Sequence, residues 1–212
     1  MYCPRCGIAN DDSSRTCASC GSTLVRPERP KRPQVKPVSV GFYFGSVASA
    51  GSIGAALVML SAWQLRENPL RLGYLFPLLF GEVALCYAAV VWLVLWHKAW
   101  QTVQDGMART SAARAIGFMF IPVFNLYWVF NAVWGFARDY NAFVKRHKLP
   151  VDPLPEWLFM AYCLCAVAGV VMAFVPYARF LFPLLAWAVW AAVTFRAARG
   201  INRLTRYPTV QV

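Results

Sequence analysis

Four cysteines in the first twenty residues have the spacing of a metal site. Cys3 and Cys6 form one C-x2-C pair, and Cys17 and Cys20 form a second pair ten residues later. A glycine directly follows each pair, and glycine adopts the positive φ that such a tight turn needs. Two turns of this kind supply four thiolates, which complete the tetrahedral shell of a structural zinc ion. The spacing therefore predicts one structural Zn²⁺ bound by these four cysteines.

Two disulfides of a secreted module and a redox-active dithiol are the alternatives to zinc. No cleavable signal peptide precedes Cys3, since the first twenty residues are polar, so we expect this segment to stay in the reducing cytosol. A redox site would need only one C-x-x-C pair. Four cysteine ligands leave no position for water, so the predicted metal has a structural and not a catalytic role.

The strings CPRCG and CASCG resemble the short zinc-ribbon family found at the N-termini of many bacterial proteins. The resemblance covers residues 1–25 and implies a binding or regulatory module. About twenty residues cannot build a hydrophobic core, so the metal is expected to hold this fold together.

The rest of the chain has the composition of a multipass membrane protein. Hydrophobic residues make up 59% of the 212 residues and charged residues 14%, against about 45–50% and about 25% in soluble domains. This composition excludes an ordinary soluble enzyme and a disordered tail. The formal net charge of +12 is expected to reflect topology and attraction to anionic lipid, and nucleic acid is not an expected partner.

Residues 26–39 are predicted to form a proline-rich basic linker. Its four prolines favour an extended polyproline-II spacer. Its basic side chains would be attracted to an anionic inner leaflet: Arg26, Arg29, Lys31, Arg32 and Lys36. The same charges are also explained as a topology signal alone.

Five apolar runs are long enough to cross a bilayer, for which about 20 residues are needed: residues 40–63, 72–96, 115–137, 157–175 and 177–195. The third contains Pro122 and two asparagines, which are costly in lipid. If all five cross, Lys and Arg divide into 11 inside and 10 outside; if the third returns to its own side, they divide into 18 and 3. The positive-inside rule favours the second arrangement.

We therefore predict an all-α multipass membrane protein with four transmembrane helices, a re-entrant or interfacial helical hairpin and a small N-terminal zinc ribbon. The hairpin covers residues 110–137, with its apex at the sequence FIPVFN. The membrane domain covers residues 40–200, and residues 201–212 form a cytosolic tail. Both termini are expected in the cytosol of a bacterium, with the helices in its inner membrane. Five full spans remain the alternative.

Three polar residues fall inside predicted membrane segments. Glu82 is the one acid of the second span, and Asn125 and Asn131 lie in the hairpin. A carboxyl group in a bilayer is either protonated or paired. Glu82 is either a proton or cation site or a neutral carboxyl hydrogen-bonded to one of these asparagines. Asn125 is also expected to cap the broken helix of the hairpin.

Three further patterns suggest how the helices are placed. Trp92, Trp96 and Trp100 share one helix face and predict an aromatic belt at the inner membrane boundary. His97 and His147 stand beside lysines and are expected to be interfacial. In the first span small residues recur every fourth position, which allows close approach of a neighbouring span or a second copy of the chain: Gly41, Gly45, Ser49, and Ser46, Ala50, Gly54.

Four arginines near the C-terminus follow helical spacing and predict one basic face on the inner leaflet: Arg196, Arg199, Arg203 and Arg206. The positive-inside signal explains them as well.

The stretch AIGFMFIPVFNLYWVFNAVWGFARDYN resembles a signature of uncharacterised bacterial multipass membrane proteins, which is approximately AVGFLFIPFFNLYWIF followed by GLAKDLN. The resemblance covers about residues 96–141. It implies a membrane protein and supplies no catalytic residues. Asp139 lies in this stretch beside Arg138, and an ion pair between them is expected.

These features lead to two functional hypotheses. The first is a non-enzymatic membrane sensor, adaptor or scaffold whose cytosolic zinc ribbon recruits an unidentified protein partner. The second is a small transporter or channel component built around the hairpin and Glu82, which would need an oligomer because four spans enclose little pore. No nucleophile motif, phosphate loop or acid pair points to an enzyme.

Overall fold

The computed structural model describes residues 2–11, 14–24, 35–68, 72–172 and 178–207. The chain forms two compact units, Met1–Pro30 and Lys31–Val212. The first unit is the cysteine-rich segment. In the second, every named element of the described residues is a helix. Most of the predicted basic linker, including Arg26, Arg29, Lys31 and Arg32, lies outside the described residues, whereas Lys36 is described and exposed.

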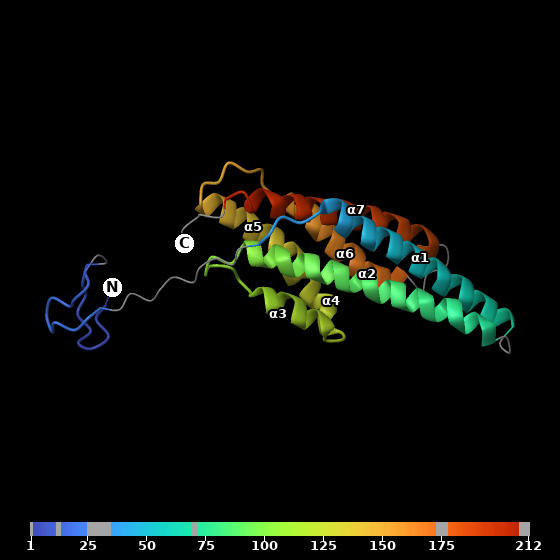
Figure 1. Cartoon of the computed structure of the whole chain (residues 1–212), viewed down its shortest axis with the longest axis horizontal. Helices are drawn as coiled ribbons and strands as arrows, with labels where there is room; N and C mark the ends of the chain where they lie inside the picture. The colour runs from blue at the N-terminus through green and yellow to red at the C-terminus, as the bar shows by residue number, and fades with distance from the viewer. Residues whose placement is uncertain (1, 12–13, 25–34, 69–71, 173–177, 208–212) are drawn as a thin grey trace. The chain divides into compact units, whose positions relative to one another are not determined.

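Four long helices and a group of short ones make up the second unit (Figure 1). The long helices are α1 (Val40–Glu67), α2 (Leu75–Thr102), α6 (Glu156–Met172) and α7 (Ala178–Leu204). The short elements are η1 (Leu72–Tyr74), α3 (Ala112–Gly117), η2 (Phe118–Phe120), α4 (Phe124–Val129), the π-helical turn η3 (Phe130–Trp134) and α5 (Gly135–Arg146).

Helices α1 and α2 lie side by side and run in opposite directions (Figure 1). Helix α1 begins at Ser39, whose hydroxyl accepts a hydrogen bond from the N–H of Phe42 at 3.2 Å, as an N-cap does. The two helices approach closely at Gly54 and Gly81, where a Cβ added to Gly54 would lie 2.8 Å from the carbonyl oxygen of Gly81. The predicted small-residue contact at Gly54 is therefore made with the neighbouring helix.

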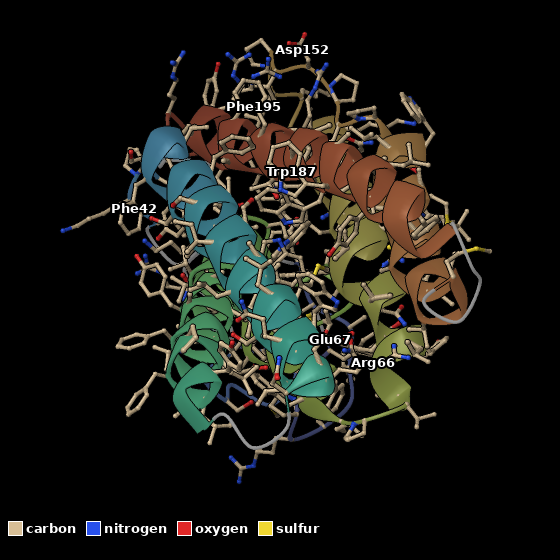
Figure 2. The ribbon with its side chains drawn as sticks, turned by 90° about the vertical axis from the view of Figure 1, so that its right-hand side faces the viewer. Phe42, Arg66, Glu67, Asp152, Trp187 and Phe195 are labelled. Carbon is tan, nitrogen blue, oxygen red and sulfur yellow. The ribbon has the colours of Figure 1, made fainter. Side chains whose placement is uncertain are left out.

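Helix α7 packs against both α1 and α6. On the α1 side, Phe44 stacks on Trp190 with ring centroids 5.8 Å apart, and it also contacts Trp187, which is labelled in Figure 2. Aromatic pairs at this distance add to the apolar contact between two helices. In the end view of Figure 2, α1 lies between α2 and α7.

Two helices of the described residues, α1 and α2, are long and apolar enough to cross a membrane. Helix α6 has 17 residues in the described part of the chain, or about 26 Å at 1.5 Å per residue, which is less than the hydrocarbon thickness of about 30 Å. The predicted spans 157–175 and 177–195 include residues 173–177, which are outside the described part. Two of the four predicted spans are thus supported, and the number four stays a prediction.

The chain between α2 and α6 changes direction at residues 121–123, within the predicted apex FIPVFN. Pro122 lies at this break, and Val123 has a φ of 65°, which β-branched residues rarely adopt. Across the break, Trp128 Nε1 donates a hydrogen bond to the carbonyl of Ala115 at 3.0 Å. This bond ties α4 to α3.

The second arm is longer than the sequence predicts. It was expected to finish at Ala137, but helical structure continues without a break through η3 and α5 to Arg146. Part of this longer arm is the π-helical turn η3. In this turn the N–H of Gly135 donates to the carbonyl of Phe130, five residues back. The carbonyl of Ala132, in the same turn, accepts a hydrogen bond from Trp100 Nε1 on α2 at 2.8 Å.

Buried side chains gather at one end of the helical unit. They come from the last part of α2, from α5, from the first half of α6 and from the last part of α7. The largest fully buried ones are Trp96, Trp100, Tyr140, Phe136 and Phe143. The opposite half of α1 and α2 instead exposes large apolar side chains, among them Ile53, Leu60, Phe76 and Phe80.

The α1–α2 contact gives a direct test of this packing. Gly54→Ala places a methyl group against the backbone of Gly81 and should lower the free energy of unfolding by about 1–3 kcal/mol, the usual cost of overpacking. Gly45→Ala is the matched control, because no atom lies within 4 Å of its added Cβ, so the helix should become up to about 1 kcal/mol more stable. Denaturant unfolding followed by circular dichroism measures both. Equal effects of the two substitutions would contradict this packing.

Candidate functional site

The two C-x2-C pairs fold into turns with the same backbone pattern. In each turn the glycine N–H donates to the carbonyl of the first cysteine, from Gly7 to Cys3 at 2.9 Å and from Gly21 to Cys17 at 3.0 Å. The φ angles of these glycines are 73° and 67°, a region that other residues rarely adopt. Because the two turns repeat the same geometry, they bring four sulfurs toward one point.

The distances between the sulfurs fit a single zinc ion. The Sγ atoms of Cys3 and Cys20 lie 3.7 Å apart and those of Cys6 and Cys17 lie 3.6 Å apart, and all four lie within 4.8 Å of one another. With Zn–S bonds of about 2.3 Å, two sulfurs of a tetrahedral shell lie about 3.8 Å apart. A disulfide would need about 2.05 Å. The four cysteines therefore fit one structural Zn²⁺.

Neighbouring groups change the acidity of these thiols. A hydrogen bond with the Ser22 hydroxyl, at 3.2 Å, lowers the pKa of Cys3 to about 6. Backbone hydrogen bonds lower the pKa of Cys17 as well. For Cys6, a backbone hydrogen bond at Ile8 lowers the pKa, but burial and the crowding of the other thiols outweigh it and raise the pKa to about 12. A bound zinc ion would favour the thiolate form of all four cysteines, including Cys6, because zinc binds cysteine as the thiolate.

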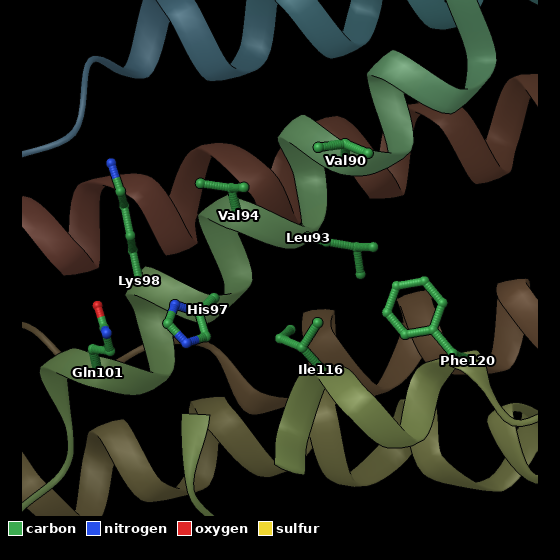
Figure 3. Close-up of a pocket in the computed structure, with 8 residues that line it drawn as sticks. All are labelled: Val90, Leu93, Val94, His97, Lys98, Gln101, Ile116 and Phe120. Carbon is green, nitrogen blue, oxygen red and sulfur yellow. The ribbon is translucent and has the colours of Figure 1, made fainter. Parts of the chain in front are cut away.

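A groove opens on the helical unit between α2 and the α3–η2 segment (Figure 3). Its volume is about 380 Å³, within the range of ligand sites. Apolar side chains line one part of it and polar side chains of α2 line the other. His97, expected from the sequence to be interfacial, is one of the polar residues and is partly exposed here.

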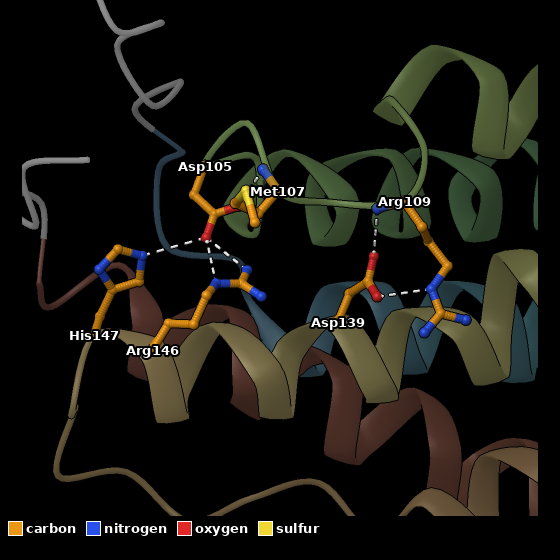
Figure 4. Close-up of polar contacts among 6 residues, drawn as sticks. All are labelled: Asp105, Met107, Arg109, Asp139, Arg146 and His147. Carbon is orange, nitrogen blue, oxygen red and sulfur yellow. Dashed lines mark hydrogen bonds and ion pairs between the residues drawn. The ribbon is translucent and has the colours of Figure 1, made fainter. Parts of the chain in front are cut away.

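The loop between α2 and α3 is held by the carboxylate of Asp105 (Figure 4). This side chain is almost completely buried and accepts hydrogen bonds from Arg146 at 2.6 and 3.1 Å and from the N–H of Met107 at 2.9 Å. His147 Nε2 lies 3.3 Å from the same carboxylate. Burial by itself raises the pKa of Asp105, but the hydrogen bonds and the charge of Arg146 outweigh it and lower the pKa below its ordinary value.

A second carboxylate fastens the other end of the same loop. Asp139 accepts hydrogen bonds from both the backbone N–H and the Nε of Arg109, each at 2.9 Å (Figure 4). The expected ion pair with Arg138 is therefore wrong. Arg138 lies instead over the ring of Trp134, with 4.9 Å between its guanidinium carbon and the ring centroid. Residues 105–109 are thus attached to α5 at two points.

Two asparagines hold the segments that lead into α1 and α6. Asn202 on α7 accepts from the N–H of Val38 at 2.7 Å and donates to its carbonyl at 2.8 Å. Asn141 on α5 makes the same pair of bonds to Leu154, at 2.7 and 2.9 Å. Each asparagine amide thus provides hydrogen-bond partners for the backbone N–H and carbonyl of a residue just before a helix, Val38 before α1 and Leu154 before α6. These polar contacts all lie at the end of the unit where the buried side chains gather.

Sequence reasoning missed this polar network. One usable signal was the Asp105–Gly106 turn, since an aspartate before a glycine often binds a backbone N–H two residues on. Another was the placement of Asp139 and Asn141 on a helix that also carries Phe136 and Tyr140. Acidic and amide groups on such a face need partners when the face is buried.

The predicted tryptophan belt is wrong. Trp96 and Trp100 are 1% and 0% exposed, so they belong to the core and not to a lipid-facing boundary. Trp96 contacts Phe136 and Phe159 with ring centroids 5.6 and 6.3 Å apart. Trp96 and Trp100 share the face of α2 that meets α5 and α6. Their spacing in the sequence shows that they share a face, but it does not show whether other helices or lipid cover that face.

The structure does not bring Glu82 together with either hairpin asparagine. Glu82 is exposed on α2, and no hydrogen bond joins it to another described residue. The side chains of Asn125 and Asn131 are partly exposed and likewise have no hydrogen bond to a described residue. The residue in the N-cap position of α4 is Val123, so Asn125 does not cap this helix.

Of the four arginines predicted to form a basic face near the C-terminus, three are exposed and one is held in an ion pair. Arg196, Arg199 and Arg206 are exposed, and Arg199 lies over the ring of Phe195 at 4.1 Å. Arg203 instead forms an ion pair with Asp152 at 3.0 Å. Three of the four arginines are therefore free to face a surrounding surface.

The comparisons with known proteins identify the first unit alone. The zinc-ribbon domain family matches residues 2–24, which include all four cysteines of the metal site. A search of curated proteins and a search of solved structures each found no match. The N-terminal unit is thus a zinc-ribbon domain, and the resemblance of the helical unit to a membrane family stays a prediction.

The metal site predicts a stoichiometry. The purified chain should contain one Zn²⁺, and Cys3→Ser or Cys20→Ser should remove it, because three thiolates and a hydroxyl do not complete the shell. Cys86→Ser is the matched control, since Cys86 is an exposed thiol in the helical unit. Elemental analysis of protein purified without chelator measures the metal content. A zinc-free wild-type chain, or loss of zinc in the Cys86 variant, would contradict the assignment.

The Asp105 site predicts a pH dependence of stability. Because its pKa is lowered by folding, Asp105 stabilises the protein above about pH 4, and this stabilisation is lost as the pH falls through the lowered pKa. At pH 7, Asp105→Asn should therefore reduce the free energy of unfolding by about 1–3 kcal/mol, and the difference from wild type should shrink in acid. Asp152→Asn, which removes an exposed ion pair, should change little. Urea unfolding at several pH values measures both, and a pH-independent loss would contradict this role.

Proposed function

We propose that this protein is a non-enzymatic membrane-anchored sensor, adaptor or scaffold whose cytosolic zinc ribbon recruits a protein partner. The observation that carries the proposal is a zinc ribbon with four converging thiols on the same chain as long apolar helices that remain exposed. A structural zinc site keeps a small domain folded so that its surface can bind. The helices supply the anchor.

The exposure of α1 and α2 supports the membrane anchor. Only 11% of the apolar window of α1 and 22% of that of α2 is buried inside the protein. The core helix of a water-soluble protein would be mostly buried, and monomeric soluble proteins rarely expose contiguous apolar patches of more than a few hundred Å². A lipid bilayer would cover these side chains without cost.

The membrane arrangement that we propose has four spans, with the hairpin of residues 110–137 entering and leaving on the cytosolic side. It accounts for the division of basic residues into 18 inside and 3 outside. It also puts the polar network of Asp105 and Asp139 at the inner boundary, where water would reach the partly exposed side chains of Arg109 and Arg146. The exposed apolar side chains at the helix break, Phe120 and Val123 among them, would then lie in the inner leaflet. Both termini would be in the cytosol of a bacterial cell.

The ribbon itself offers an apolar contact surface to a partner. Tyr2 is 77% exposed and Ile8 is 47% exposed. In such a small unit the buried apolar groups are few, namely Cys3, Cys17 and Leu24. Exposed aromatic and aliphatic side chains are typical anchors of protein–protein contacts. We therefore assign partner binding to the surface around Tyr2 and Ile8.

A second candidate function is transport of a proton or a cation. The observation in its favour is Glu82, an exposed carboxyl group within a candidate span that pairs with no described residue. Transport would need a homo-oligomer. No atom lies within 4 Å of a Cβ added at Gly41 or Gly45, so a second copy has room to approach α1 there. In liposomes, an ion flux that disappears in Glu82→Gln would favour this function over recruitment.

Recruitment is tested by crosslinking the full chain in cells. A discrete crosslinked cytosolic protein should be present with wild type and should be lost with Tyr2→Ala plus Ile8→Ala, which leaves the zinc ligands intact. Met107→Ala is the control, because Met107 is also a highly exposed apolar side chain, at 71%, but lies in the helical unit. Cys17→Ser should also abolish the product by unfolding the ribbon. A product that persists in all variants, or the absence of any product with wild type, would contradict recruitment.

A further inference from the structure

We infer that the groove between α2 and the α3–η2 segment is a binding site for one anionic phospholipid of the inner leaflet. The inference rests on the membrane placement proposed above. It goes beyond that placement because it assigns a specific ligand class to particular residues.

The lining of the groove changes from apolar to polar along one face of α2 (Figure 3). Val90, Leu93 and Val94 line the first part, and His97, Lys98 and Gln101 line the second. Ile116 and Phe120 close the apolar part from the opposite side. This order matches an amphiphile with a hydrocarbon chain and a polar head.

The length of the groove matches one leaflet. Val90 and Gln101 are eleven residues apart, which is about 16 Å along a helix, and half of the hydrocarbon thickness is about 15 Å. In the proposed topology α2 ends on the cytosolic side, so Lys98 and Gln101 lie near the headgroups and Val90 lies deeper. A lipid of the inner leaflet has the same orientation.

Lys98 provides the charge complement for a phosphate. Its Nζ donates to the hydroxyl of Tyr43 at 2.8 Å and lies 5.2 Å from the centroid of that ring. An ammonium group has three donors, and no carboxylate of a described residue pairs with it. Gln101 and His97 add further polar groups whose side chains have no hydrogen bond to a described residue. A partly buried cation of this kind favours an anionic headgroup over a zwitterionic one.

The apolar part of the groove is open to a hydrocarbon chain. Val90, Val94 and Phe120 are 58%, 42% and 70% exposed. Phe120 lies in η2, which leads into the helix break, so an acyl chain seated here would contact both α2 and the hairpin. Because these side chains already lie in hydrocarbon in the proposed placement, an acyl chain seated here gains van der Waals contact with both walls of the groove. The site therefore binds the lipid by its chain as well as by its phosphate.

The test uses the full chain in nanodiscs that contain phosphatidylglycerol and phosphatidylcholine, with bound lipid counted by native mass spectrometry after release. We expect the wild type to retain one phosphatidylglycerol in preference to phosphatidylcholine. Lys98→Gln should weaken this retention about fivefold or more, the size of one basic contact to an anionic lipid. Phe120→Ala should weaken it as well, because it shortens the apolar wall at an exposed position where folding is not at risk.

Lys145→Gln is the matched control, since it makes the same change of charge at an exposed position on α5 outside the groove. Equal weakening by Lys98→Gln and Lys145→Gln, or equal retention of both lipids by wild type, would overturn the site. Inorganic phosphate in excess should not displace the lipid; displacement would show that the site binds a free anion and would also overturn the proposal. A chain that does not insert into nanodiscs would overturn the membrane placement and the site together, whereas an inserted chain without lipid preference overturns the site alone.

Discussion

The arrangement of the helical unit depends on two carboxylates that attach one short loop to α5. Asp105 holds the start of the loop through Arg146, and Asp139 holds its end through Arg109. Since the loop leads directly into α3, these bonds help to hold the broken helix beside α2, together with the hydrogen bond from Trp100 on α2 to Ala132. The α3–η2 segment held in this way forms the second wall of the groove beside Lys98. A buried carboxylate that loses its partner is costly, so the two ion pairs fix one arrangement.

The two units of the chain are stabilised by different means. Among the described residues of the ribbon, the buried apolar cluster consists of Cys3, Cys17 and Leu24, so its fold needs the metal. The helical unit has a large core among its described residues, at the end where α2, α5, α6 and α7 meet. The other half of α1 and α2 exposes apolar side chains, which the proposed bilayer would cover. Metal, polar network and bilayer thus each stabilise a separate part of the proposed protein.

The sequence predicted the features that follow from local spacing. Two C-x2-C pairs with their glycines specify the zinc site, because the ligands lie within a few residues of one another. The start of α1 and the helix break at Pro122 also follow from local signals. Features that depend on long-range packing were not predictable. The spacing of Trp96 and Trp100 shows that they share a face but not which helix covers it, and the partner of Asp139 is 30 residues away at Arg109.

Reporter fusions measure whether the broken helix of the proposed membrane protein returns to the cytosolic side. A topology reporter fused after Lys148, following the four basic residues at 138–148, distinguishes the two arrangements. We expect this fusion and a C-terminal fusion both to report the cytosol, and a fusion after Arg71 to report the opposite side. If the Lys148 and C-terminal fusions both report the exterior, residues 115–137 cross the membrane completely and the chain has five spans.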